Sequence, residues 1–332
     1  MTRRIGLGLI VAGLLAALAA PLVVPHASGD RFPDLLNAPP TLPHLVDDSG
    51  RWHPPFIYPW RLADRLQQRY QQDQTTRISL VWFVEGHLVR SADEGRAPLL
   101  LLGADSYGRD VFSRLLAGAR ISLGLSIAAA LGSILIGGVI GAAAGYAGGA
   151  TEDLLMRASD AVMVLPAMYV VLALRAALPL VLEPSAVFLL LTAIFAVVGA
   201  PVVSRGVRGI IRTERRLDYA VAAASLGASH ARLLGRHLLP ATKGYVAVQM
   251  TLLVPAFIVG EATLSYIGLG FPDPVASWGT MLREASNVRA FTDFPWLLSP
   301  AAAMFLFVLG LNLVLQGRSG HVGRGLGLQW PR

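Results

Sequence analysis

The sequence predicts an all-α membrane protein with about six transmembrane helices, and three observations support this prediction. Of the 332 residues, 54% are hydrophobic and only 15% are charged, whereas soluble domains usually carry about 25% charged residues. The mean hydropathy is correspondingly positive, at +0.55. Long apolar runs recur along the chain, and each approaches the roughly 20 residues that a helix needs to cross a bilayer. These runs occupy residues 5–24, 121–144, 161–182, 185–203, 245–267 and 297–315.

The first apolar run is either a signal peptide or a membrane helix. Two arginines precede it, and the Ala-Leu-Ala sequence at residues 17–19 resembles a cleavage site. The run continues to Val24, however, and about 20 residues exceed the usual 7–15 of a signal-peptide apolar region. Length therefore favours an uncleaved first transmembrane helix over residues 1–24. Cleavage would leave five spans with the same function.

A long segment, residues 25–102, follows the first helix outside the membrane. It is rich in proline and tryptophan, which is typical of turns and extended chain. Residues 61–74 could form a short polar helix, and residues 77–84 followed by 87–90 predict a β-hairpin. The histidines here lack the close pairing of zinc ligands, and the chain has no cysteine, so we expect no metal site. A small extracytoplasmic subdomain is predicted.

The second span is preceded by a stretch of mixed character, residues 101–124. Apolar residues recur there at helical spacing, with Arg109, Arg114 and Arg120 between them. This pattern predicts an amphipathic helix that lies at the membrane interface before the second span.

The second span itself carries Gly137, Gly141 and Gly145 at four-residue steps. Small residues with this spacing let another helix approach closely within a bilayer. A glycine face would give a pore no side chains with which to bind or select a solute. We therefore expect close helix packing at this stripe rather than a pore lining.

Basic residues predict the orientation of the chain. The net charge of +7 would be typical of nucleic-acid binding in a soluble protein. Here the arginines and lysine gather in the loop 204–243 and near both ends, and short loops of this kind remain in the cytoplasm. We expect a multi-pass protein of the cytoplasmic membrane with both termini inside, in contact with membrane lipid and not with nucleic acid.

A few ionisable residues lie in or near the predicted spans, where such groups are often functional. Asp160, Arg175 and Glu183 lie close to span ends, from which their side chains can reach water. Glu261 lies deeper in its span. Either a structural hydrogen bond to a neighbouring helix or a role in transport accounts for it.

The most organised polar segment is residues 218–240. Its sequence predicts an Ala-rich helix, a stop at Gly227, a second short basic helix capped by Ser229, and an end at Pro240. A simple connection between two spans could be far shorter. The segment could bind lipid headgroups through its basic face, but that role would not require the glycine hinge. We expect another protein to bind this segment.

This segment resembles the cytoplasmic coupling loop of ABC-importer permeases of the peptide-transport branch. The branch pattern is D-Y-x-x-A-A-x-x-x-G, then about nine residues, then H-x-L-P. The matching positions are Asp218, Tyr219, Ala222, Ala223, Gly227, His237, Leu239 and Pro240. Two further blocks resemble branch signatures, GADSYGRDVFSRLLAGARISL at 103–123 and EATLSYIGLGFPDPVASWGTML at 261–282. The resemblance covers about residues 101–316.

The resemblance implies a type I ABC importer permease fold, with a transmembrane core over residues 103–316 and a cytoplasmic tail over 317–332. It implies four partners: a second, homologous permease, two ATPase subunits and an extracytoplasmic solute-binding protein. ATP and Mg would bind to the ATPase subunits. Consistent with this, the chain has a single lysine, Lys243, and no phosphate-binding loop of the form G-x-x-x-x-G-K-[ST]. We expect no enzymatic activity and no cofactor on this chain.

The implied function is import of peptides or a related small solute by alternating access. The 261–282 block would lie near the mouth of the pathway, with a candidate translocation or gate region at Glu261, Ser265 and Trp278. The chain departs from the pattern of the peptide-transport branch at two places. Ala104 stands where that branch usually has threonine, and the tail lacks the Arg-Asp…Asp-Pro sequence that is usual in the branch. The alternative is a stand-alone secondary transporter or channel. Such transporters usually contain inverted repeats, and no clear repeat relates the two halves.

Overall fold

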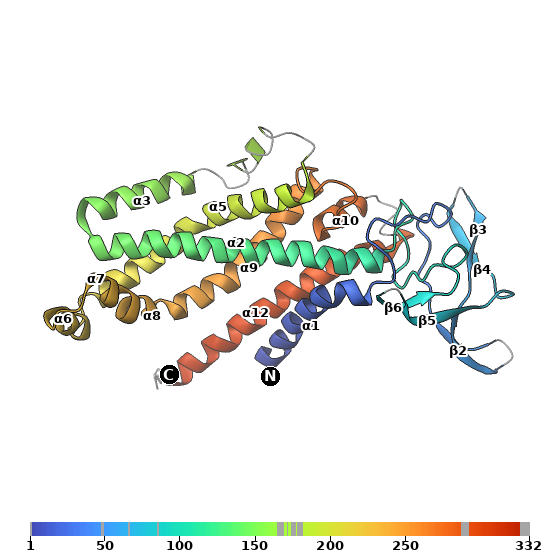
Figure 1. Ribbon diagram of the computed structural model, residues 1–332, viewed down its shortest axis with the longest axis horizontal. Helices are drawn as coiled ribbons and strands as arrows, with labels where there is room; N and C mark the ends of the chain where they lie inside the picture. Colours follow the sequence, from blue (N-terminus) through green and yellow to red (C-terminus); the bar gives the residue numbers. More distant parts are fainter. Residues whose placement is uncertain are drawn as a thin grey trace, which may run out of the picture. The chain divides into compact units, whose positions relative to one another are not determined.

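The computed structural model describes most of the chain, in two compact units. The described residues are 2–47, 50–65, 67–84, 86–164, 169–170, 172–173, 177, 182–286 and 292–325. Unit 1 comprises Met1–Arg3, Gly124–Glu261 and Leu311–Arg332, and unit 2 comprises Arg4–Leu123 and Ala262–Gly310. The boundaries between the units fall within long helices. The labelled strands gather in one region of the chain, which belongs to unit 2 (Figure 1).

Among the described residues, five helical segments are long and apolar enough to cross a membrane. They are α1 (Thr2–Val23), α2 (Val111–Ala147), α5 (Pro184–Glu214), α9 (Lys243–Tyr266), and Pro295–Gln316, which joins the 3₁₀ turn η2 (Pro295–Leu298) to α12 (Ser299–Gly325). Each coincides with a predicted span. The remaining predicted span, 161–182, and Arg175 within it lie largely outside the described residues; α3 (Gly149–Val164) leads into it. The expectation of a helical membrane protein is confirmed.

The prediction of a separate interfacial helix before the second span is wrong. The helix α2 begins at Val111 and continues without interruption to Ala147, so entry region and span form one element. Arg109 and Arg114 are 0% and 1% exposed rather than lying among lipid headgroups, whereas Arg120 is exposed. Buried charges are tolerated only where they are paired, and the pairs of these two arginines are described below.

The glycine stripe of α2 packs against α5 within unit 1. A side chain at Gly137 or Gly141 would collide with the α5 backbone, and a Cβ at Gly145 would lie 2.7 Å from the carbonyl oxygen of Arg208. Gly138, which lies outside the stripe, has no neighbouring atom within 4 Å of such a Cβ. The predicted close helix packing is confirmed.

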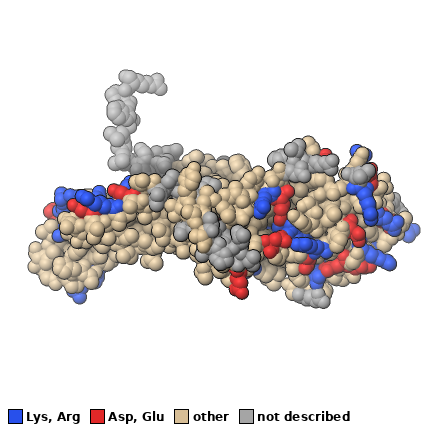
Figure 2. All heavy atoms as spheres, turned by 90° about the horizontal axis from the view of Figure 1, so that it is seen from above, with Lys and Arg blue, Asp and Glu red and all other residues tan. Residues whose placement is uncertain are grey.

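The helix α5 extends beyond its predicted span, so the first part of the loop 204–243 is helical. Ion pairs to α3 explain this extension. Arg208 and Arg212 each approach the Glu152 carboxylate at 3.0 Å, and Arg205 pairs with Asp160. Figure 2 shows basic and acidic side chains side by side in this part of unit 1, and tan surface along the helices beyond it. Asp160 is therefore accounted for by an ion pair near a helix end.

The segment 25–102 belongs to unit 2, and the regular elements among its described residues are β-strands, so only the membrane part of the chain is all-α. A four-stranded antiparallel sheet has the order β1-β2-β5-β6, and β3 pairs with β4 in a second sheet. The strands are β1 (His44–Val46), β2 (Trp52–Ile57), β3 (Trp60–Asp64), β4 (Arg69–Gln72), β5 (Ile78–Val84) and β6 (His87–Ser91). The predicted hairpin of β5 and β6 is confirmed.

The predicted polar helix at 61–74 is wrong, because β3 and β4 form a hairpin there. Trp60 of β3 and Tyr70 of β4 both pack on a cluster of buried residues around Leu35 and Leu100. The Tyr70 hydroxyl also donates a hydrogen bond of 2.7 Å to the Leu36 carbonyl oxygen. Long-range packing therefore overrides the local preference of a glutamine-rich sequence.

Candidate coupling segment and a buried charge cluster

The segment 218–240 lies in unit 1 and is helical along most of its length. Its elements are α6 (Asp218–Ser225), α7 (His230–Arg232), the π-helical turn η1 (Leu233–Leu238) and α8 (Leu239–Ala241). Alanine is the strongest helix former, and Asp218 in the first turn of α6 interacts favourably with the helix dipole. A short helix therefore forms where the sequence predicts it.

Gly227 ends α6 in the manner predicted. Its φ of +82° is in the left-handed region. The Ala228 amide donates to the Ala223 carbonyl at 3.1 Å, and the Gly227 amide donates to the Ala224 carbonyl at 3.0 Å. These two bonds form a Schellman motif, which satisfies carbonyl groups that the helix end leaves open. The direction of α6 relative to α7 is thereby set by one glycine.

The second half of the segment differs from the prediction at Pro240. Ser229 caps α7 as expected, with its hydroxyl accepting a 3.4 Å hydrogen bond from the Arg232 amide. Pro240 does not end the unit, because it lies in the first turn of α8, which leads into α9. Proline in a continuing helix removes a hydrogen bond and collides with the preceding turn. The π-helical turn η1 immediately before it widens the backbone at this point.

The helix α6 and its C-cap residue Leu226 expose large apolar side chains. Val221 and Leu226 are 52% and 89% exposed, and Asp218, Tyr219 and Ala222 are exposed as well. Ala220 points inward and is buried, and Ala223 is half-buried. Buried Leu233 and Leu238 anchor η1. An ordered helix that displays large apolar residues is typical of a binding surface.

Two of the predicted coupling residues approach each other. The Tyr219 ring lies 6.3 Å from the ring of half-buried His237. The Tyr219 hydroxyl donates a 2.5 Å hydrogen bond to Glu214 at the end of α5, and this bond raises the pKa of Tyr219. Tyr219 thus remains a protonated donor and links α6 to α5. Leu239 and Pro240 lie at the opposite end of the segment, in α8.

The three candidate gate residues are all buried. Ser265 and Trp278 belong to unit 2, and Glu261 is the last residue of its stretch of unit 1. The Trp278 amide donates to the Ser122 hydroxyl at 3.1 Å, and the Trp278 indole donates to the Leu115 carbonyl at 3.2 Å. Trp278 therefore fixes α10 (Trp278–Glu284) against α2. Glu261 and Ser265 each have interaction partners, so neither is an isolated polar group.

A cluster of charges around two buried arginines in unit 2 joins two of the sequence blocks quoted above, and the sequence does not reveal it. We call Asp105, Arg109, Arg114, Asp273 and Glu284 the charge cluster. Arg109 pairs through Nε with Asp105 at 2.7 Å, through Nη1 with Asp273 at 2.6 Å, and through Nη2 with Glu284 at 2.7 Å. Burial lowers the pKa of Arg109, but the carboxylates of Asp105 and Glu284 outweigh it and raise that pKa above its usual value.

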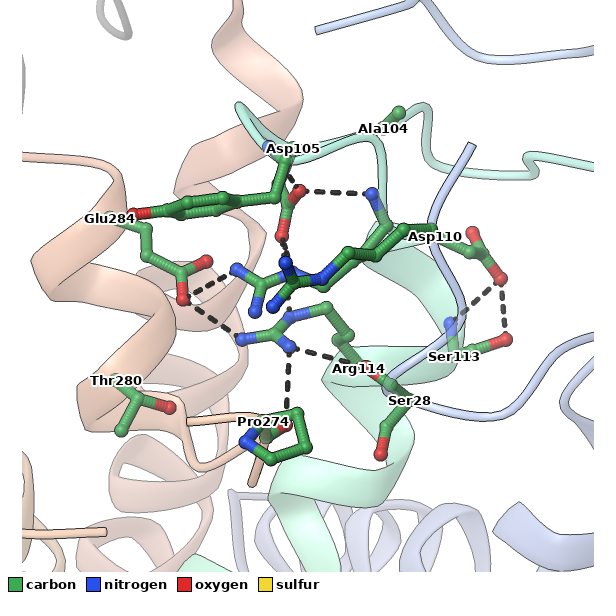
Figure 3. Close-up of polar contacts among 12 residues, drawn as sticks. Ser28, Ala104, Asp105, Asp110, Ser113, Arg114, Pro274, Thr280 and Glu284 are labelled. Atoms are coloured by element: carbon green, nitrogen blue, oxygen red, sulfur yellow. Dashed lines mark hydrogen bonds and ion pairs between the residues drawn. The ribbon is translucent and has the colours of Figure 1, made fainter. Parts of the chain in front are cut away.

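Arg114 shares the Glu284 carboxylate with Arg109 (Figure 3). Its Nη2 donates to Glu284 Oε1 at 3.0 Å, and its Nη1 donates to the backbone carbonyls of Ser28 and Pro274 at 3.2 and 3.5 Å. A guanidinium group is suited to this because its planar fork can serve several acceptors at once. One side chain of α2 therefore holds Glu284 of α10, the chain before α10 at Pro274, and the segment that contains Ser28.

The backbone around the cluster is shaped by its own short side chains. Asp105 accepts hydrogen bonds from the amides of Tyr107 and Arg109 at 2.8 and 3.0 Å, and the Asp110 side chain accepts from the Ser113 amide and hydroxyl. Gly108 adopts a φ of +76° and lies directly against the Phe32 backbone, where no Cβ fits. The start of the first block, residues 103–110, is thus a compact turn that directs Arg109 toward its carboxylate partners.

The described residues of this cluster do not form a metal site. Within the described residues, no group of three or more His, Asp or Glu side chains is placed to hold a metal ion. A pocket of about 440 Å³ lies beside the cluster, lined among others by Tyr107, Asp273, Thr280 and Glu284. Since the Asp273 and Glu284 carboxylates already pair with arginines, the arrangement is suited to holding chain segments together.

More than half of the chain is similar to known transport proteins. Residues 137–326 match the family described as "Binding-protein-dependent transport system inner membrane component". The chain is 38% identical over 216 residues to the oligopeptide transport system permease protein OppC of Bacillus subtilis, covering 65% of this chain and 68% of that protein.

Two further relatives are similar over nearly the same stretch. The dipeptide transport system permease protein DppC of Bacillus subtilis is 37% identical over 215 residues, covering 65% of each chain. The glutathione transport system permease protein GsiD of Pectobacterium atrosepticum is 34% identical over 225 residues, covering 68% of this chain and 72% of that protein. The resemblance to the peptide-transport branch and the type I permease fold are both confirmed. The chain therefore belongs to the family of binding-protein-dependent transport system inner membrane components, the permease subunits of ABC importers.

Proposed function

We propose that this chain is one of two transmembrane subunits of an ATP-driven importer, which moves peptides or a related small solute across the cytoplasmic membrane by alternating access. The relatives quoted above are named for oligopeptides, dipeptides and glutathione, which is itself a small peptide. A shared solute class among relatives of 34–38% identity supports the same class here.

The observation that carries this proposal is the exposure of large apolar side chains on α6 and at its C-cap. Val221 lies on this ordered helix and Leu226 is its C-cap residue, directly before Gly227, which fixes the helix end. A helix with exposed apolar side chains is suited to docking in a groove of another protein. We propose that α6 docks in a cleft on an ATPase subunit and passes the motion of that subunit to α5 and α9, to which it is joined.

The energy for transport comes from partner subunits in this proposal. The chain has one lysine and no phosphate-binding loop, so ATP and Mg bind to two separate ATPase subunits. A second, homologous permease completes the pathway, and an extracytoplasmic solute-binding protein delivers the solute. The block 261–282 lies near the mouth of the pathway, with Glu261, Ser265 and Trp278 in the gate region.

The proposed topology follows the distribution of basic residues. The short basic loop 204–243 and the tail 317–332 face the cytoplasm, as does the N-terminus before the first helix, residues 1–24. The segment 25–102 faces outward, where it forms a small β-rich subdomain. The core 103–316 then contains the remaining spans.

Purification of the tagged chain from native membranes tests the proposal. We expect an ATPase subunit and a second permease to co-purify. In vesicles with Mg-ATP inside and the solute-binding protein outside, we expect uptake of radiolabelled tri-alanine that stops without ATP. Co-purification of the ATPase without any peptide uptake would contradict only the peptide solute. Uptake that continues without ATP or ATPase, driven by an ion gradient, would favour the stand-alone transporter.

A further inference from the structure

Tyr146, in the last turn of α2, contacts the coupling segment from outside it. The Tyr146 hydroxyl is hydrogen-bonded to Nδ1 of His230, the first residue of α7. The two rings also meet edge to face, with their centroids 5.6 Å apart and their planes at 77°. The hydroxyl group and the ring of Tyr146 thus both contact His230, which follows the N-cap residue Ser229 of α7.

Arg215, which follows the last residue of α5, contacts Tyr146 from the other direction. Its Nη1 donates a hydrogen bond to the Tyr146 carbonyl oxygen, and its guanidinium carbon lies 5.1 Å from the Tyr146 ring centroid. A cation over an aromatic ring at this distance is attracted to it. Tyr146 therefore contacts residues on both sides of α6, since Arg215 precedes α6 and His230 follows it.

The end of α2 offers a fixed base for these contacts. Gly145 packs against α5 so closely that a Cβ would lie 2.7 Å from the Arg208 carbonyl oxygen. Beyond Ala147 the chain turns at Gly148 and Gly149, whose φ values are +71° and +56°. Tyr146 thus has a fixed position near the C-terminal end of a helix that is continuous from Val111.

We propose that Tyr146 is a positioning residue, which fixes the coupling segment to the end of α2 so that movement of α6 is delivered to this helix. The segment 218–240 is covalently joined only to α5 and α9, and α2 has no such link to it. Through His230 and Arg215, Tyr146 supplies a direct connection. This inference rests on the proposed function, because it concerns how the motion of an ATPase reaches the spans.

Hydrogen exchange on the purified full chain tests the contact without any partner. In Tyr146→Phe the ring remains and the hydroxyl is lost. We expect the amides of residues 228–232 to exchange at least about threefold faster, because local opening becomes easier. Tyr169→Phe, a change at an exposed tyrosine of the same unit, should leave this segment unchanged. Equal exchange in the parent chain and Tyr146→Phe would overturn the proposal.

Transport per ATP tests the role of the contact in the assembled complex. A solvent-exposed hydrogen bond contributes modestly to stability, so Tyr146→Phe should assemble with its partners as the parent does. We expect it to hydrolyse ATP at a comparable rate but to import roughly threefold to tenfold less tri-alanine per ATP. An unchanged ratio of solute to ATP would overturn the proposal, since a merely structural residue would not alter that ratio.

A double variant tests whether the two side chains act through one contact. If they do, Tyr146→Phe combined with His230→Ala should lose no more transport per ATP than the more severe single variant. Independent losses that multiply would contradict the proposal. If no ATPase accompanies even the parent chain while exchange of residues 228–232 responds to Tyr146→Phe, the proposed function fails and the contact stands.

Discussion

Replacing Gly227 with valine is expected to reduce solute uptake by at least about tenfold while the protein remains in the membrane at its normal level. The φ of +82° at this position is strained for any side chain and most of all for a β-branched one. Strain of this kind amounts to about 1–3 kcal/mol at a residue. No atom lies within 4 Å of the added Cβ, so the effect is confined to the backbone that aims α6.

A matched control is available in the same unit. Gly209 lies within α5, also with no atom within 4 Å of an added Cβ, and without a positive φ. Gly209→Val should therefore import at nearly the parental rate in the same cells, as measured with radiolabelled tri-alanine. Normal uptake by Gly227→Val would show that transport does not depend on how this turn directs α6.

Replacing Arg109 with alanine is expected to destabilise the protein by about 3–5 kcal/mol, because removal of one partner from a buried ion cluster leaves the others uncompensated. Asp105 would remain buried without its principal cation, and Glu284 would keep only Arg114. The thermal unfolding midpoint of the purified chain in detergent should fall by many degrees. Arg109→Lys should also be strongly destabilising, since one ammonium group cannot reach three carboxylates in different directions.

An exposed ion pair of unit 2 provides the comparison. The Arg96 side chain is 76% exposed and lies 3.7 Å from Asp93. Such pairs contribute about 0–1 kcal/mol, so Arg96→Ala should unfold at nearly the parental temperature. If Arg109→Ala unfolds at the same temperature as Arg96→Ala, the charge cluster does not hold unit 2 together.

Features encoded by neighbouring residues could be predicted from the sequence. The glycine stripe of α2 is a four-residue repeat, and it does pack on α5. The end of α6 at Gly227 and the cap at Ser229 depend on single residues with strong backbone preferences. The β5–β6 hairpin follows from two apolar runs separated by a short turn. In each case the residues that carry the signal lie close together in the sequence.

Features that depend on distant residues could not be predicted. Arg109 and Arg114 look like interfacial charges in a local pattern, because their partners Asp273 and Glu284 lie more than 150 residues away. The β3–β4 hairpin forms because Tyr70 and Trp60 reach a core built from residues outside that segment. The contacts of Tyr146 with Arg215 and His230 likewise join elements that are far apart in the chain.

The most direct test of the central claim asks which protein contacts Leu226. The chain contains no cysteine, so Leu226→Cys introduces a single thiol at an 89% exposed position. After attachment of a photoreactive thiol reagent in native membranes, illumination should join the chain to a polypeptide that contains a phosphate-binding loop, identified by mass spectrometry. Leu189→Cys, on the membrane-spanning part of α5 and 69% exposed, should give no such product. Labelling of Leu226→Cys without any adduct to an ATPase would contradict the account.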